Sequence, residues 1–434
     1  MPTPLDSFIP ILPTPLCNFY GFLSITFDSF VSLQPKIVYK HKKNVMDALL
    51  FRYHNLLKET DTHFLRYLHD LIPWNDRMIA IVGSRGVGKT TMLLQHIKLH
   101  LPIDKTLYVS ADDLYFSDHG LFDLARRFHQ MGGQHLFVDE IHKYANWSQE
   151  LKNIYDTIPQ LQVVFTGSSI LDVYHGTHDL SRRVLTFTLH GMSFREYLAM
   201  KKGLSIPVHS LGDIMQHKIK TDGLEYPLAA FRDYLRKGYY PFTESEGYDI
   251  RLLNVVNRVL ETDIPIYAKL NISSIAKLKR LLNILAESVP FKPNISKLAQ
   301  ILDVSRETLN DYLEYMVRAK LLNALHDDTQ GIRGLGKVEK IYLENTNLAH
   351  ALTPQPEIGN IRETFFLNQL QVNHRVLSAG SSDFLIDDKY TFELGGKNKG
   401  QKQIKGISAA FVVKDDIEYG VFNVLPLWHF GLMY

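Results

Sequence analysis

A second cysteine is missing from this chain, which has only Cys17 among its 434 residues. A disulfide within the chain and a zinc site built from several cysteines are therefore both excluded. Because proteins without disulfides are usual in reducing compartments, we expect this protein in the cytoplasm. The chain also has almost no net charge, since its 48 Lys and Arg residues are nearly balanced by 46 Asp and Glu residues, for a formal net charge of +2. The chain as a whole thus has no general preference for nucleic acid or membranes, and any basic surface must be local.

A membrane-spanning segment is not predicted either. Residues 7–27 carry no charge and are rich in Phe, Leu and Ile, but three prolines interrupt them. Asp6 stands where a signal peptide would have Lys or Arg, and no small-residue cleavage pattern follows. We therefore expect no membrane partner. Residues 1–45 are interpreted as a poorly structured extension or as the result of a start codon assigned too early, with the folded protein beginning at Met46.

The clearest pattern that is present binds phosphate. Residues 83–90 fit G-x-x-x-x-G-K-[ST], and they follow the apolar run 78–82 and precede a helical stretch at 91–100. In this order of strand, turn and helix, the backbone N–H groups of the turn and the helix dipole attract phosphate. A chance glycine-rich turn is the alternative, but it would not require the flanking strand and helix. The predicted phosphate-binding residues are Gly83, Ser84, Arg85, Gly86, Val87, Gly88, Lys89, Thr90 and Thr91.

Two of these residues have predicted roles in the chemistry. Lys89 is expected to contact the β- and γ-phosphates, and the hydroxyl of Thr90 is expected to bind the Mg²⁺ that bridges them. No Asn-Lys-x-Asp sequence for recognising guanine occurs in the chain, so ATP is the favoured nucleotide. The predicted cofactors are therefore ATP and Mg²⁺.

Downstream of this loop, an apolar run ends in two acids, Asp139 and Glu140. A parallel sheet binds its ligand at the C-terminal ends of its strands. Asp139 is expected to hold the Mg²⁺ through water, and Glu140 is expected to orient or deprotonate the water that attacks the γ-phosphate. Two acids in this position can instead cap the next helix. The phosphate loop upstream favours the catalytic interpretation and predicts a hydrolysing ATPase.

A third strand, at 161–169, ends in hydroxyl side chains. Thr166 or Ser168 is a candidate for a polar catalytic residue between the two acids and the γ-phosphate, although a simple turn that ends the strand is the alternative. Arg182 and Arg183 follow. An arginine here could stabilise charge on the transferred phosphoryl group, within one chain or across a subunit interface, and a surface salt bridge is an equal alternative.

Strands alternate with helices through this part of the chain, which predicts an α/β fold with a parallel sheet covered on both faces. Residues 46–70 have apolar residues at helical spacing and should form a helical lead-in that packs beside the sheet. Residues 201–275 predict a helical lid or spacer, in which no catalytic chemistry is evident.

A helix-turn-helix pattern follows the spacer. Helices are predicted at 281–288, 295–302 and 305–320, and Ser305 is the expected N-cap of the third. That helix would be the one offered to a major groove. Five basic residues face four acidic residues between Lys292 and Lys320, however, which makes a poor phosphate-binding surface. Packing against protein is therefore favoured slightly over DNA binding.

Taken together, these motifs resemble a known family. The phosphate loop, residues 135–143 around Asp139, residues 165–169, Arg183 and the Ser-Phe-Arg-Glu-Tyr run at 193–197 are similar to the bacterial and archaeal P-loop ATPases of the AAA+ superfamily. The resemblance covers 46–434. It implies a sheet with an extra strand, ATP hydrolysis with Glu140 as base, a winged helix and a nuclease-like C-terminal domain. The family usually has Gly-Arg where this chain has Arg182-Arg183, and we assign its arginine to Arg183.

The resemblance also suggests a second site near the C-terminal end. A nuclease of this type needs carboxylates for divalent metal, here Glu363, Asp383 and Glu393, and a lysine two residues after the last acid. That position is Gly395, and the first lysine beyond it is Lys397. We therefore expect a restriction-endonuclease-like domain without activity. The lysines of this stretch are expected to form a flexible basic loop that contacts phosphate, and they are Lys397, Lys399, Lys402 and Lys405.

The predicted domains are an ATPase core at 46–200, a helical lid at 201–275, a winged helix at 276–340 and a small α+β domain at 341–434. Three functions remain open. The first is an ATPase whose hydrolysis drives or gates conformational change in its C-terminal domains. The second is a nucleotide-gated DNA-binding regulator or defence factor, and the third is an interaction module that binds ATP without turnover. Besides ATP, the expected partners are another protein or a second copy of the chain, and DNA under the second reading.

Overall fold

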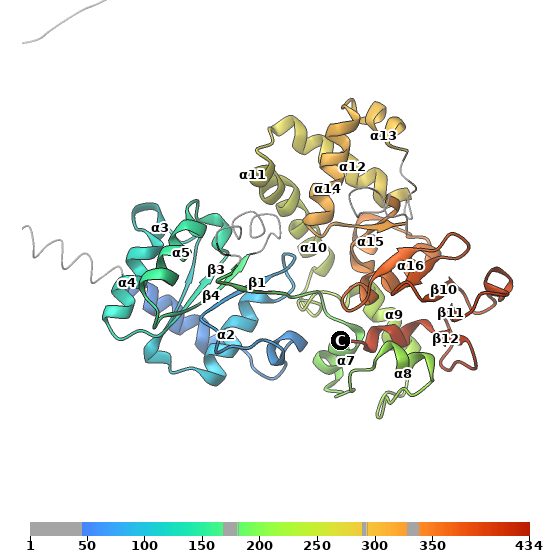
Figure 1. The fold of residues 1–434 in the computed structure, drawn as a ribbon, viewed down its shortest axis with the longest axis horizontal. Coiled ribbons are helices and arrows are strands. Elements are labelled where there is room, and N and C mark those ends of the chain that lie inside the picture. Colours follow the sequence, from blue (N-terminus) through green and yellow to red (C-terminus); the bar gives the residue numbers. More distant parts are fainter. Residues whose placement is uncertain (1–45, 168–179, 181, 289–291, 293, 328–337) are drawn as a thin grey trace, which may run out of the picture. The chain divides into compact units, whose positions relative to one another are not determined.

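The computed structural model describes residues 46–167, 180, 182–288, 292, 294–327 and 338–434. Its N-terminal sheet has five strands in the order β2-β3-β4-β1-β5, and every pair of neighbours is parallel (Figure 1). All five residues of β1 are buried, as expected for a strand covered on both faces. The extra strand predicted from the sequence, β4, lies between β1 and β3. The bounds are β1 Met78–Val82, β2 Thr106–Ser110, β3 His135–Asp139, β4 Gln162–Gly167 and β5 Leu185–Thr188.

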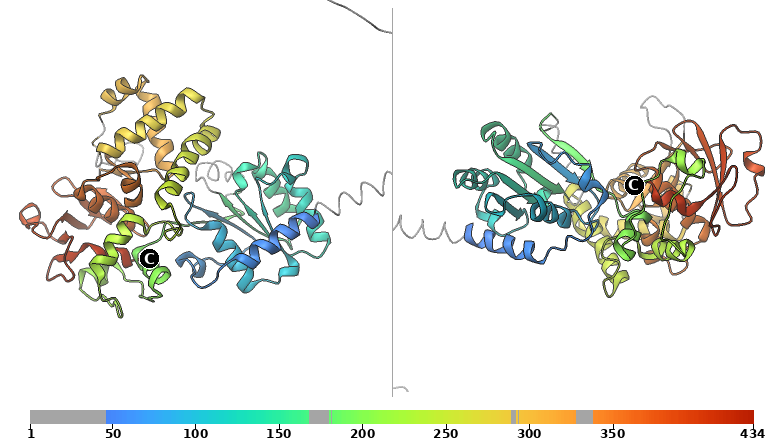
Figure 2. Two further views of the ribbon diagram at one scale, coloured as in Figure 1. Left: turned by 180° about the vertical axis from the view of Figure 1, so that it is seen from behind. Right: turned by 90° about the horizontal axis from the view of Figure 1, so that it is seen from below.

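Helices cover this sheet on both faces (Figures 1 and 2). The connection from β1 to β2 runs past β4 and β3, whereas the connection from β3 to β4 runs the other way, and right-handed crossovers therefore put α2 and α5 on opposite faces. The predicted α/β fold is confirmed. The helices of this region are η1 Tyr67–Asp70, α2 Lys89–His100, η2 Ile103–Lys105, α3 Tyr115–Asp118, α4 Leu121–Gln130, η3 Ile141–Lys143 and α5 Trp147–Thr157.

The predicted helical lead-in at 46–70 is only partly correct. Residues 46–59 are helical, but residues 60–66 are not, and only the short η1 follows. The side-chain amide of Gln95 donates to the backbone carbonyls of Asp61 and Phe64, at 2.8 and 2.9 Å. These carbonyls accept hydrogen bonds from a side chain of α2, whereas in a helix they would accept from backbone N–H groups. Packing against α2 therefore determines the shape of this segment, and its own apolar periodicity does not.

The predicted spacer is helical in the structure. One of its neighbours, α7, begins with a capping box, in which Ser193 accepts from the backbone of Glu196 and the Glu196 side chain accepts from Ser193. A π-helical turn, η4, separates α10 from α11. The elements are α7 Phe194–Lys202, α8 Leu211–Met215, α9 Pro227–Lys237, α10 Tyr248–Arg258, η4 Val259–Asp263, α11 Ile264–Ala268 and α12 Ile272–Ser288.

Three helices and a two-stranded antiparallel sheet follow in the order α12, α13, α14, β6 and β7. The predicted N-cap is confirmed, because the backbone N–H of Thr308 donates to Oγ of Ser305 over 3.0 Å. The bounds are α13 Ile295–Leu302, α14 Arg306–Arg318, β6 Leu322–His326 and β7 Val338–Leu343.

A second five-stranded sheet forms the C-terminal part, in the order β12-β11-β10-β9-β8. The pairs among β10, β11 and β12 are parallel, and β8, β9 and β10 pair antiparallel, so β9 and β10 form a hairpin. The bounds are α15 Thr346–Leu352, α16 Ile358–Leu370, β8 Val376–Ser378, β9 Phe384–Ile386, β10 Tyr390–Gly395, η5 Lys402–Ile404, β11 Ala410–Lys414, β12 Val424–Pro426 and η6 Leu427–Leu432.

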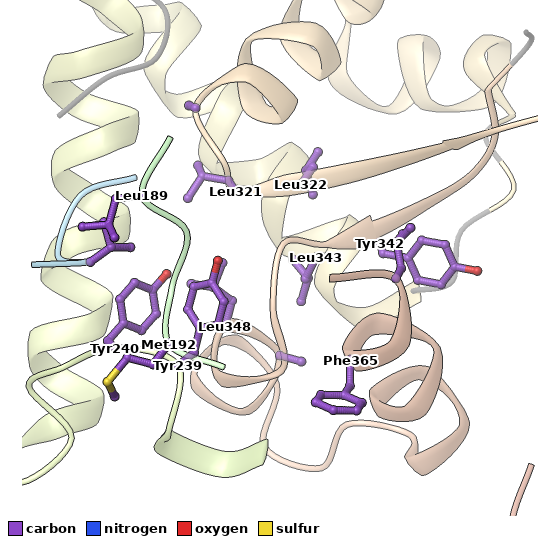
Figure 3. Close-up of a cluster of buried hydrophobic side chains, with 14 of the residues drawn as sticks. Leu189, Met192, Tyr239, Tyr240, Leu321, Leu322, Tyr342, Leu343, Leu348 and Phe365 are labelled. Atoms are coloured by element: carbon purple, nitrogen blue, oxygen red, sulfur yellow. The ribbon is translucent and has the colours of Figure 1, made fainter. Parts of the chain in front are cut away.

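A shared hydrophobic core joins segments that are far apart in the sequence. Figure 3 shows part of it, where Leu189, Tyr240, Leu321 and Tyr342 lie among other buried side chains. The residue after β5 thus belongs to the same core as β6 and β7. Among the described residues, no helix has both the length and the apolar character needed to cross a membrane.

Candidate nucleotide site

The phosphate-binding loop connects β1 to α2, as the sequence predicts. Gly86 and Gly88 have φ angles of +85° and +97°, which L side chains rarely adopt. Gly83 is constrained by space, because a Cβ there would lie 2.3 Å from the carbonyl oxygen of Leu189. The glycines of the motif are therefore required by the shape of the loop.

Lys89 lies at the start of α2 and folds back over the loop. Its Nζ donates to the carbonyl oxygens of Gly83 and Ser84, at 2.8 and 3.0 Å. Burial lowers the pKa of Lys89 to about 8, while the nearby carboxylates oppose that shift. The ammonium group therefore lies inside the loop that is predicted to surround phosphate.

The two halves of the predicted site meet at Asp139. Thr90 donates from Oγ1 to Oδ2 of Asp139 over 2.6 Å, and Thr166 donates to the other carboxylate oxygen. Tyr108 on β2 also donates to Oδ2, over 2.8 Å, and no local motif had pointed to this residue. A hydroxyl and a carboxylate at one point are the oxygen ligands that Mg²⁺ prefers, so Thr90 and Asp139 fit the predicted ion.

Glu140 follows directly and has an unusual backbone. Its φ of 52° is left-handed, which is uncommon for a residue other than glycine. Its backbone N–H donates to Oγ1 of Thr166 over 3.1 Å. Thr166 thus contacts both predicted acids, and its catalytic role stays a prediction, whereas Ser168 lies outside the described residues.

Cationic and imidazole groups surround the carboxylate of Glu140. Arg85, His142 and Lys143 approach its Oε2 at 3.4, 3.7 and 3.9 Å. Burial lowers the pKa of His142, which favours its neutral form. The Glu140 carboxylate is 17% exposed, so it keeps access to solvent.

Arg85 connects the phosphate loop to the helical lid. Its guanidinium lies 3.4 Å from Glu140 and 3.3 Å from Asp263, which is buried at the end of η4. The sequence alone did not point to Asp263, which is 178 residues away from Arg85. A pocket opens beside this pair, and it is lined by Arg85, Gly86, Phe242, Arg251, Asn254, Val255 and Arg258.

Arg66, which is buried, also supports the phosphate loop. Arg66 binds Glu196 through two nitrogens, at 2.9 and 3.1 Å, and donates to the carbonyl of His190 over 2.7 Å. It also donates to the carbonyl of Val87 in the phosphate loop. The Ser-Phe-Arg-Glu-Tyr run was noticed in the sequence, but its part in holding this loop was not.

The structure places Arg183 apart from the other candidates. Its guanidinium binds Asp156 through Nε and Nη2, at 3.0 and 3.1 Å, near the C-terminal end of α5. This end of α5 leads to the start of β4, whereas Asp139 is at the end of β3, on the opposite edge of the sheet. The salt bridge that the sequence left open for this arginine is present, and its catalytic role stays a prediction.

The three acids predicted to bind metal in the C-terminal part, Glu363, Asp383 and Glu393, have basic partners. Lys340 approaches Glu363 and Asp383 at 3.2 and 3.9 Å. Burial raises the pKa of Asp383 to about 6. The predicted basic loop is incorrect in one respect. The side chain of Lys399 forms an ion pair with the buried Glu393, so this lysine is not simply part of a surface loop.

The space for Lys399 comes from Gly395. A Cβ at this glycine would lie 2.5 Å from Cγ of Lys399, so a side chain there would block its path. Gly395 stands where the family has its lysine, and the lack of a side chain at Gly395 leaves room for Lys399 to reach Glu393. The inactivity of this domain as a nuclease stays a prediction.

Two family models match this chain. Residues 75–198 match the model described as "AAA domain", and residues 228–358 match a "Domain of unknown function (DUF8612)". The first match contains the phosphate loop, Asp139, Glu140 and Thr166. Residues 75–198 are therefore an AAA domain with a P-loop.

Similar proteins say less about the role of the whole chain. An uncharacterized protein of Methanocaldococcus jannaschii is 28% identical over 318 residues, which cover 68% of this chain and 66% of that protein. The match thus spans less than two thirds of that relative's length. AMPPCP-bound DnaA from Aquifex aeolicus has 14% identity and a TM-score of 0.25 over 60% of this chain and 85% of its own. A katanin structure has 16% identity and a TM-score of 0.26, over 62% and 86%, and scores of this size carry no argument about this chain.

Proposed function

We propose that this chain, whose residues 75–198 are an AAA domain with a P-loop, binds Mg²⁺ and ATP and hydrolyses the nucleotide. The hydrogen bond between Thr90 and Asp139 carries this proposal, because it joins the two motifs at one point. Lys89 and the N–H groups of the loop would bind the β- and γ-phosphates. Thr90 and Asp139 would hold Mg²⁺, which supplies positive charge that stabilises the transferred phosphoryl group.

Glu140 is the proposed base. It follows Asp139 directly, so it lies at the edge of the sheet where the phosphates are expected, and its carboxylate remains partly exposed to water. Thr166 contacts the backbone of Glu140 and the side chain of Asp139, and we assign it the role of fixing the positions of these two acids relative to each other. Arg85 and Lys143 would position the Glu140 carboxylate through their ion pairs with it.

The ion pairs of Arg85 support the further proposal that hydrolysis gates the C-terminal domains. One guanidinium contacts both the proposed base, Glu140, and the lid residue Asp263. A change in charge at the γ-phosphate would alter how Arg85 divides its contacts between these two acids. Two more arginines from the lid, Arg251 and Arg258, line the pocket beside the loop and are positioned to respond to the same charge.

Hydrolysis of ATP by the purified full chain tests the proposal. The Glu140→Gln variant should bind ATP but turn it over about 10²- to 10⁴-fold more slowly, the usual size of a general-base effect. Glu59→Gln, an exposed change in the first helix, is the matched control and should hydrolyse ATP normally. Equal turnover in both variants would place the base elsewhere. Tight ATP binding without turnover in the unaltered chain would instead support an interaction module.

The arrangement of α12, α13, α14, β6 and β7 supports the proposal of a winged helix. Its third helix does not favour DNA, because the exposed charged residues of α14 include three acids and two arginines. We therefore propose a protein contact for this helix, and ATP hydrolysis measured with and without double-stranded DNA separates the alternatives. Stimulation by DNA would favour the nucleotide-gated regulator. The charged residues concerned are Arg306, Glu307, Asp311, Glu314 and Arg318.

We also propose that Arg183, if it acts in phosphoryl transfer, does so in a second copy of the chain. Its salt bridge with Asp156 is on the edge of the sheet away from its own Asp139. Such a role predicts that ATP turnover per chain rises with protein concentration.

The single cysteine supports the further proposal of a cytoplasmic location.

A further inference from the structure

Three histidines gather at the end of α2 that is farther from the phosphate loop. His96 and His100 are four residues apart on α2 and therefore lie on one face of the helix, and His69 comes from η1. One ring nitrogen of each lies within 4.8 Å of the corresponding nitrogens of the other two. The cluster has no part in the proposed hydrolysis.

Two of these rings have buried nitrogens that make no hydrogen bond within the described part of the chain. They are Nε2 of His69 and Nδ1 of His96, and both residues are only 5% exposed. A buried polar atom without a partner loses its hydrogen bonds to water without replacement, so native proteins usually satisfy it. Both residues belong to the same cluster, which points to one shared ligand.

Neighbouring side chains fix the two buried rings. Nδ1 of His69 lies 3.1 Å from a carboxylate oxygen of Asp70, and a proton on this nitrogen leaves the lone pair on Nε2. Trp74 stacks on the His96 ring, with centroids 3.8 Å apart and an interplanar angle of 11°. Contacts with neighbouring side chains therefore hold both buried rings in fixed orientations.

We propose that His69, His96 and His100 bind a divalent transition-metal ion of the Zn²⁺ class. Imidazole ligands suit Zn²⁺, Cu²⁺ and Ni²⁺, whereas Mg²⁺ prefers oxygen, so this site differs chemically from the one at Thr90 and Asp139. Tetrahedral Zn²⁺ with Zn–N bonds near 2.0–2.1 Å needs nitrogens about 3.4 Å apart. The exposed His100 can rotate to close that distance, and water takes the fourth position on its open side.

The ion would connect η1, which contains His69, to α2. His69 is three residues after Arg66, whose guanidinium donates to Val87 in the phosphate loop. A metal bridge from η1 to α2 would therefore hold the segment that supports the loop. It links two elements that come before and after β1 in the sequence.

Binding of Co²⁺ and Zn²⁺ to the full chain, purified without a histidine tag and stripped with a chelator, tests the site. We expect one Zn²⁺ per chain, visible absorption bands of tetrahedral Co²⁺ that Zn²⁺ displaces, and a rise in melting temperature on adding Zn²⁺. His100→Ala changes an exposed residue and should weaken Zn²⁺ binding at least about 100-fold, since the loss of an outer carboxylate partner alone costs about 10- to 100-fold.

Two control variants separate this site from other sources of binding. His63→Ala removes a histidine whose side chain is 94% exposed, and Asp139→Ala removes the proposed Mg²⁺ ligand. Both should keep the Co²⁺ spectrum and the Zn²⁺ affinity. Absence of Zn²⁺ binding by the unaltered chain, or equal affinity in His100→Ala and His63→Ala, would overturn the proposal and leave the cluster as aromatic packing.

Discussion

The hydroxyl of Thr90 and the carboxylate of Asp139 are joined by a hydrogen bond of 2.6 Å, although 49 residues separate them in the sequence. Thr90 is in the first turn of α2, and Asp139 is the last residue of β3. The strand β4 lies between β1 and β3, so the contact spans one intervening strand. The hydroxyls of Thr166 on that strand and Tyr108 on β2 reach the same carboxylate. Four elements thus position a single acid.

Replacing Lys89 by alanine should abolish ATP binding. The change removes the buried ammonium group that is directed into the phosphate loop. Isothermal titration calorimetry with ATP and Mg²⁺ measures the loss. Lys98→Ala, which alters an exposed lysine on the same helix, is the control and should bind ATP normally. Unchanged affinity in Lys89→Ala would contradict the assignment of this lysine.

Thr166→Val should separate catalysis from binding. Valine keeps the shape of the side chain but loses the hydroxyl that contacts Asp139 and the backbone of Glu140. We expect ATP affinity to stay within about threefold, and turnover to fall roughly 10- to 100-fold, because a lost buried hydrogen-bond partner costs about 1–3 kcal/mol. Steady-state kinetics would compare it with Thr157→Val, an exposed change at the end of α5. Equal kcat values would exclude a role for the Thr166 hydroxyl.

Asp263→Asn should disturb the link between loop and lid. Without this buried carboxylate, Arg85 should pair more closely with Glu140 and draw its carboxylate away from the attacking water. We expect turnover to fall by up to about 100-fold, the usual cost of misplacing a catalytic group by about 1 Å. Glu261→Gln, in the same η4 but paired with Lys279, is the control. The interpretation fails when both variants hydrolyse ATP at the same rate.

Glu344 should make the stability of the fold depend on pH. It is fully buried, and burial raises its pKa from 4.5 to about 7, against the opposing charge of Lys320. Between these two values the folded chain holds a proton that the unfolded chain has lost, so stability falls as the pH rises through this interval, by about 3 kcal/mol at most.

Denaturant unfolding from pH 5 to pH 8 measures this effect, with Glu344→Gln beside the unaltered chain. The variant should lose most of the pH dependence in that range and should be the more stable protein at pH 8. Glu418→Gln, at an exposed position, should keep the slope of the unaltered chain. Parallel curves for Glu344→Gln and the unaltered chain would mean that another group titrates.

Local sequence determined the parts of this protein that depend on neighbouring residues. A strand, a glycine-rich turn and a helix follow one another without a break from β1 to α2, so their order predicts the loop and the place of Lys89. The same holds for the acids after β3 and for the Ser305 cap, which acts on a residue three positions away. In each case the interacting groups are close in the sequence, so their contact does not depend on how distant segments pack.

Tertiary structure alone decided which distant side chains complete the site. Arg66 finds Glu196 at a separation of 130 residues, and Arg85 finds Asp263 at 178. No spacing rule predicts such pairs, because they depend on how separate elements pack and on which buried charges then need partners. The His69 cluster and the path of Lys399 over Gly395 have the same origin. Periodicity predicted the elements, whereas the satisfaction of buried polar groups determined their partners.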